Sequence, residues 1–138
     1  MKPTSYALAA LLIAVATIPA GAAGALAVGT TGNVAQDGVA IGVAGDYETT
    51  AEARNAALDE CRSADASPQT RQRCQIVRDY KFQCTAVAMD EAVGQPGIGW
   101  AVNRDETRAQ WDALTECRRT AGSRAGNCRV IGVSCDGL

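Results

Sequence analysis

Histidine is absent from the 138-residue sequence, and aromatic residues make up only 4% of it. Without histidine the chain can form neither a Ser-His-Asp triad nor a Cys-His nucleophile pair. The sequence also has no C-x-x-C motif, so the closely spaced cysteines of a structural zinc site are missing. We therefore expect no metal, no cofactor and no enzyme activity, and we expect a core rich in alanine.

The sequence also has no excess of positive charge, since it contains 13 lysines and arginines and 15 aspartates and glutamates. The formal net charge is −2, and removal of Lys2 with an N-terminal leader would lower it to −3. A weakly acidic chain lacks the basic surface that binds phosphate backbones. We therefore expect no nucleic-acid partner.

The N-terminus has the pattern of a Sec-type signal peptide. Lys2 supplies a positive charge, the apolar run Ala7–Ile18 follows, and small residues come after Pro19. We predict a signal peptide at residues 1–23 and one domain at residues 24–138. The mature protein would be secreted or periplasmic, without a stable membrane span.

Two positions fit the A-x-A cleavage rule, Ala20–Ala22 and Ala25–Ala27. We prefer cleavage after Ala22 or Ala23, because the later cut would remove an expected strand. The alternative is an uncleaved anchor, since Ala7–Val28 is long enough to span a bilayer.

Six cysteines follow the predicted signal peptide, at Cys61, Cys74, Cys84, Cys117, Cys128 and Cys135. An even number of cysteines behind an export signal predicts a disulfide framework.

The sequence also carries a repeated pattern. "ALDEC" at Ala57 returns as "ALTEC" at Ala113, and the match extends outward to strand-like segments on both sides. The halves are residues 24–82 and 83–138, and each is predicted to run strand, strand, helix, strand. Two copies are too few for a solenoid, so we expect one compact domain with pseudo-twofold symmetry.

Local signals support the two helices. Thr49 and Glu52 form a capping-box pattern at the first helix start, and Asn103 or Asp105 can cap the second. Small residues recur along each helix at i, i+4 and i+8, ending in cysteine. We expect an α+β fold with one antiparallel or mixed sheet of about six strands and both helices on one side.

The two halves suggest a disulfide pairing. In each half, the cysteine at the helix end and the cysteine at the next strand start would close a short loop, which gives Cys61–Cys74 and Cys117–Cys128. Cys84 and Cys135 would then pair across the halves. Six cysteines allow fifteen connectivities, so the other pairings stay open.

The sequence resembles the small exported bacterial proteins of domain-of-unknown-function family 4189. The matching pieces are "GALAV" at Gly24, "ARNAALDEC" at Ala53, "CQIV" at Cys74, "CTAVAM" at Cys84, "GIGWAV" at Gly97, "AQWDALTEC" at Ala109 and "CRVIGVSC" at Cys128. The loops "GTTGNVAQDG" and "RSADASPQTRQR" are longer than in the family pattern. The resemblance implies no activity, substrate or catalytic residue.

Two groups of basic residues and two tryptophans are candidates for partner binding. The groups are Arg118, Arg119, Arg124 and Arg129 near the last loop, and Arg71, Arg73, Arg78 and Lys81 in the first half. They could meet an anionic envelope polymer or an acidic protein, or they could be ordinary surface charges. Trp111 is off the alanine stripe and can be exposed, whereas Trp100 is expected in the core.

Three functions remain open. The first is a disulfide-stabilised binding or interaction module with an unknown protein or envelope partner. The second is an extracytoplasmic inhibitor or immunity-type protein that inserts the loop Arg62–Arg73 into a cleft. The third is an enzyme that uses the carboxylates of Asp90-Glu91 or Asp105-Glu106, which we interpret instead as solvated turn residues. The sequence indicates no oligomeric state.

Overall fold

The computed structural model describes residues 21–137. The predicted signal peptide therefore lies outside the described residues, except for its last three positions. No helix within residues 21–137 is long and apolar enough to cross a membrane.

The chain follows the predicted order of strands and long helices, with three short helical turns added. The first half contains β1 (Ala23–Gly29), α1 (Val34–Asp37), β2 (Ala40–Tyr47), α2 (Thr50–Ser63), α3 (Pro68–Arg71) and β3 (Gln75–Lys81). The second half contains β4 (Cys84–Met89), β5 (Ile98–Asn103), α4 (Glu106–Ala121), the 3-10 helix η1 (Gly122–Asn127) and β6 (Arg129–Cys135).

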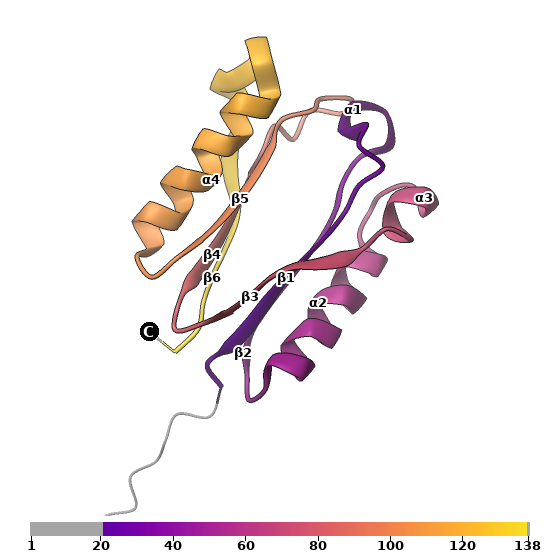
Figure 1. The fold of residues 1–138 in the computed structure, drawn as a ribbon. Helices are drawn as coiled ribbons and strands as arrows, with labels where there is room; N and C mark the ends of the chain where they lie inside the picture. The colour runs from indigo at the N-terminus through magenta and orange to yellow at the C-terminus, as the bar shows by residue number, and fades with distance from the viewer. Residues whose placement is uncertain (1–20, 138) are drawn as a thin grey trace, which may run out of the picture.

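The strands form two antiparallel sheets of three strands each, so the single six-stranded sheet that we expected is not confirmed. The strand orders are β2-β1-β3 and β5-β4-β6, and the first strand of each half is therefore central. Figure 1 shows α2 on the outer side of the first sheet and α4 on the outer side of the second. The two helices thus lie on opposite sides of the molecule, which corrects our expectation of both on one side.

The sheets stack because each of them has two faces to bury. Ala25 of β1 packs against α2, whereas Leu26 points to the other face of the strand and is also fully buried. In β4, Ala86 packs against α4, while Thr85 and Val87 are buried on the opposite face. A helix can cover only one face of a sheet, so the second face of each sheet is covered by the other half.

Small side chains let each helix lie directly on its sheet. The buried stripes are those that the sequence predicts, Ala53, Ala57 and Cys61 in α2 and Ala109, Ala113 and Cys117 in α4. A Cβ atom added at Gly42 of β2 would lie 1.9 Å from the Ala57 carbonyl oxygen, and one at Gly99 of β5 would lie 2.3 Å from the Ala113 carbonyl oxygen. Glycine is therefore required where the helix backbone crosses the strand.

The helix caps follow the sequence signals. The Thr49 hydroxyl accepts a hydrogen bond from the Glu52 amide, and the Glu52 carboxylate accepts one from the Thr49 amide, which completes the capping box. Asp105 is the cap of α4, with its carboxylate accepting from the Arg108 amide at 2.7 Å.

Three disulfides join Cys61 to Cys74, Cys117 to Cys128 and Cys84 to Cys135, which are the pairs suggested by the two halves. The reason that we gave for the third pair is wrong. Cys84 and Cys135 face each other on the neighbouring strands β4 and β6, so this bond closes the second half and does not cross to the first.

Candidate functional site

The four arginines near the last loop do not form an open positive patch. Arg119 pairs with Glu116 within α4, with Nε 3.0 Å from the carboxylate. Arg124 pairs with Asp90. Arg118 and Arg129 are exposed and have no ion pair with residues 21–137. Half of the expected cluster is therefore neutralised.

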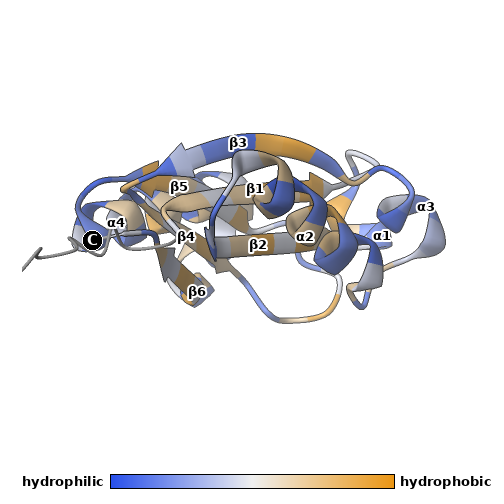
Figure 2. Cartoon of the chain, turned by 90° about the horizontal axis from the view of Figure 1, so that it is seen from below, coloured by the Kyte–Doolittle hydropathy of each residue, from blue (hydrophilic) through white to orange (hydrophobic). Residues whose placement is uncertain are grey.

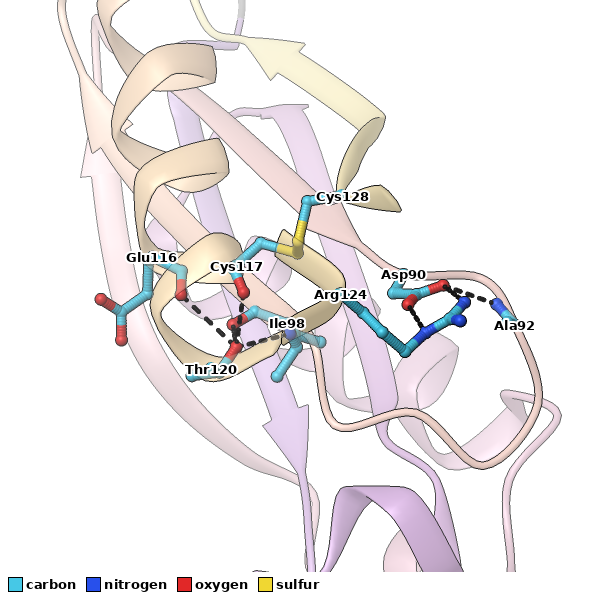
Figure 3. Close-up of a disulfide and its surroundings, with 8 residues drawn as sticks. All are labelled: Asp90, Ala92, Ile98, Glu116, Cys117, Thr120, Arg124 and Cys128. Carbon is cyan, nitrogen blue, oxygen red and sulfur yellow. Dashed lines mark hydrogen bonds and ion pairs between the residues drawn. A yellow bond between two sulfur atoms is a disulfide. The ribbon is translucent and has the colours of Figure 1, made fainter. Parts of the chain in front are cut away.

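The Arg124–Asp90 pair joins the loop after α4 to the end of β4. Arg124 Nε donates to Asp90 Oδ2 at 2.7 Å, and the Ala92 amide donates to Asp90 Oδ1 at 3.1 Å (Figure 3). The guanidinium bond is the main reason that the pKa of Asp90 lies below its usual range. The Asp90 side chain is only 3% exposed, so it is not the solvated turn residue that we expected.

The two tryptophans lie in different surroundings. Trp111 is 57% exposed and borders a shallow hollow of about 260 Å³ with Asp105, Thr107 and Arg108. Trp100 is 36% exposed, which corrects our expectation that it is a core residue. The physical reason is that β5 is an outer strand of its sheet, so its side chains are covered on fewer sides.

The carboxylate pairs of the enzyme hypothesis lie at opposite ends of a hairpin. Asp90 follows the end of β4 beside Ile98, and Asp105 follows the end of β5 beyond Asn103. A strand rises about 3.3 Å per residue, so this hairpin separates them by about 17 Å. Paired carboxylates of glycosidases lie within about 10 Å of each other, and these two pairs cannot act together in that way.

Cys84, Cys135 and Glu106 bring potential metal-ligand atoms within 4.8 Å of one another. Both sulfur atoms belong to one disulfide. They offer no thiolate, so this cluster does not have the donor set of a thiolate metal site.

Three arginines of the first half lie on the surface near the end of α2 and around α3. No carboxylate within residues 21–137 forms an ion pair with Arg62, Arg71 or Arg73. Arg62 and Arg71 line one hollow of about 300 Å³ together with Pro68 and Gln72. The sequence grouping had included Arg71 but not Arg62.

A larger cleft of about 430 Å³ lies where loops of the two halves meet. Its walls are residues 34–39 and 65–67 of the first half and residues 89–95 of the second. The lining includes four carboxylates and no basic residue: Asp37, Asp65, Asp90 and Glu91. Val93, on the rim, is 100% exposed.

The walls of this cleft are held in place by specific contacts. The buried Thr70 donates from its hydroxyl to the Asp37 carbonyl at 3.0 Å, which ties α3 to α1. In Figure 2 these two short helices lie together at one end of the molecule, and α3 is largely hydrophilic. Gly94, with φ of 78°, lies next to Ala35, because a Cβ atom there would be 3.6 Å from the Ala35 carbonyl oxygen.

A buried polar group lies between the two sheets. Asp136 is fully buried and accepts from the Asp46 amide at 2.8 Å through Oδ1, while Oδ2 has no hydrogen-bond partner within residues 21–137. Burial raises the pKa of Asp136 above its usual value. Burial also raises the pKa of the neighbouring Tyr80 to about 12, and its hydroxyl donates to the Ala44 carbonyl at 3.2 Å.

Sequence reasoning missed the acidic cleft and Asp136. Asp37 and Asp65 are 28 positions apart, and no short-range pattern connects them. The sequence did contain a signal for the hollow at Arg62 and Arg71, because both residues fall inside the segment that the Cys61–Cys74 bond was expected to close.

No curated protein and no solved structure matches this chain. The model of one family, described as Domain of unknown function (DUF4189), matches residues 23–135. These residues include the first half, nearly all of the second half and all six cysteines. The chain belongs to the DUF4189 family.

Proposed function

We propose that the protein is an exported binding module, rigidified by its disulfides, that engages a partner at the cleft between its two halves. The observation that carries this proposal is the cleft itself, about 430 Å³ in volume and lined by segments 34–39, 65–67 and 89–95. Ligand-binding clefts commonly have volumes of about 300–1,000 Å³. Three disulfides support a location outside the cytoplasm, in the periplasm or beyond the cell.

The charge of the cleft defines the kind of partner. Arg124 neutralises Asp90, and the Asp37 carboxylate accepts a hydrogen bond from the Thr31 hydroxyl at 2.6 Å. No cation within residues 21–137 pairs with Asp65 or Glu91. A protein segment that carries a lysine or arginine next to an apolar side chain would complement these carboxylates and Val93.

The test is capture with a matched pair of variants. The oxidised protein is cross-linked in native envelope extract, the partner is identified by mass spectrometry, and its affinity is then measured directly. Val93→Arg places a cation on the rim and should weaken binding at least tenfold, since it opposes the charge of the partner. Val133→Arg changes another exposed valine, on β6, and should leave the affinity unchanged. Equal binding by wild type and Val93→Arg would refute the proposed cleft.

The second candidate function is an inhibitor that inserts an exposed loop into a cleft of its partner. The loop that we expected to insert, Arg62–Arg73, folds into α3 around the buried Thr70. A second loop that could insert is the one that carries Val93, whose side chain is 100% exposed. An activity assay of the captured partner separates the two functions, because an inhibitor lowers its turnover and an adaptor does not.

A further inference from the structure

We propose that the hollow lined by Arg62, Pro68, Arg71 and Gln72 binds a phosphate group. Two arginines and one glutamine line the same hollow of about 300 Å³. The planar guanidinium fork matches the oxygens of a phosphate, and two such groups balance the charge of roughly −2 that a phosphate monoester carries near neutral pH.

The two arginines are available for a ligand. No acidic side chain within residues 21–137 forms an ion pair with either of them. In the second half, by contrast, the loop arginine Arg124 is bound to Asp90. An unpaired pair of cations in a chain of net charge −2 provides a local anion site.

The hollow is also rigidly built. All four of its lining residues lie between Cys61 and Cys74, so one disulfide closes the segment that contains them. Inside this segment the Arg71 amide donates to the Ser67 carbonyl and the Gln72 amide donates to the Pro68 carbonyl, each at 3.0 Å. The backbone that carries the site is therefore organised before a ligand arrives, which lowers the entropy cost of binding.

The duplicated sequence pattern provides a matched control. Arg62 directly follows the helix cysteine Cys61, and Arg118 directly follows the helix cysteine Cys117. Arg118 is also exposed and without an ion pair in the described part of the chain, but it does not line this hollow. Arg62→Gln and Arg118→Gln therefore remove the same charge from corresponding positions, and only the first should affect the site.

The experiment is an NMR titration of the oxidised protein with inorganic phosphate and with glycerol 3-phosphate, at constant ionic strength set by sodium chloride. We expect saturable shifts of the Arg62 and Arg71 side-chain Nε–H signals, with a Kd of roughly millimolar order for so small a ligand. Arg62→Gln and Arg71→Gln should each weaken binding about tenfold. Arg118→Gln should bind as wild type does.

Inorganic phosphate, glycerol 3-phosphate and phosphatidylglycerol vesicles are three probes that distinguish the source of the phosphate. Tighter binding of glycerol 3-phosphate than of inorganic phosphate identifies an ester, and equal binding identifies the phosphate group alone. Co-sedimentation with phosphatidylglycerol vesicles that depends on Arg62 identifies a lipid headgroup. The proposal would be overturned if sodium chloride alone reproduced the shifts. It would also be overturned if Arg62→Gln and Arg118→Gln lost the same amount of affinity for phosphate. Because Arg62 is exposed, its replacement should leave the protein folded. Circular dichroism of the variants checks that they are folded.

Discussion

Replacement of Gly42 by alanine should be among the most damaging small changes in this protein. The added Cβ would lie 1.9 Å from the Ala57 carbonyl oxygen and 2.6 Å from the Cys61 amide nitrogen. Both are helix backbone atoms, so no side-chain rotation can relieve the clash. Since van der Waals contact needs about 3.4 Å, α2 would have to move away by about 1.5 Å.

Such a movement would loosen the whole alanine stripe of α2 from its sheet. Overpacked positions cost about 1–3 kcal/mol of unfolding free energy, and we expect about 3 kcal/mol here because the backbone itself must move. For a domain of this size that is roughly 12 °C in melting temperature. The assay is thermal and urea unfolding of the oxidised protein, followed by circular dichroism.

Two further glycine variants provide a parallel test and a control for this prediction. Gly99→Ala tests the corresponding contact of α4, with its Cβ at 2.3 Å from the Ala113 carbonyl oxygen, and should cost about as much. Gly132→Ala of β6 is the control, because nothing lies within 4 Å of its added Cβ. It should be neutral or stabilise by up to about 1 kcal/mol. Gly42→Ala within about 0.5 kcal/mol of wild type would refute the packing argument.

Three other variants test the buried polar groups and one disulfide. Burial raises the pKa of Asp136, so wild-type stability should fall as pH rises from the unfolded-state pKa through the raised native one. Asp136→Asn should therefore gain stability relative to wild type between pH 3 and pH 7 in urea unfolding, and a pH-independent difference would contradict this. Asp90→Asn should lower the stability at pH 7 by leaving Arg124 without its ion pair. This loss should shrink near pH 2, because the lowered pKa of Asp90 stabilises the fold only while the carboxyl is ionised. Replacement of Cys84 and Cys135 by alanine opens a loop with a separation of 51 residues and should cost about 4 kcal/mol, and a loss under about 1 kcal/mol would count against the loop-entropy account.

Local features of the fold could be predicted because they are encoded by nearby residues. The Thr49–Glu52 cap and the buried alanine stripes are patterns that span only a few positions, and the structure has both. The division into two sheets has no such local pattern. Strand periodicity shows that Leu26 and Thr85 face away from the helices, but it does not show whether solvent, a helix or another sheet covers them.

The candidate sites were harder to predict for a related reason. Arginines close together in sequence were treated as one patch, yet Arg124 is held by Asp90, 34 positions away, and Arg119 by Glu116 of its own helix. The useful information was which charges remain unpaired, and this depends on tertiary contacts. The acidic cleft is also a tertiary feature, because Asp65 and Glu91 belong to different halves.

The two halves share their order of strands and long helices, so what differs between them is the best guide to function. Each places a helix over a three-stranded sheet, with a glycine under the helix and a disulfide at its end. In the second half the loop after the helix forms η1, and its Arg124 serves an internal ion pair. In the first half the corresponding loop forms α3 and leaves Arg62 and Arg71 unpaired beside an acidic cleft. The shared framework is common to both halves and so does not distinguish a binding site in either of them. Arg62 has a counterpart in Arg118, but only Arg62 shares a hollow with a second arginine, Arg71. Substitutions at Arg62 and Val93 should therefore change ligand affinity without changing the melting temperature.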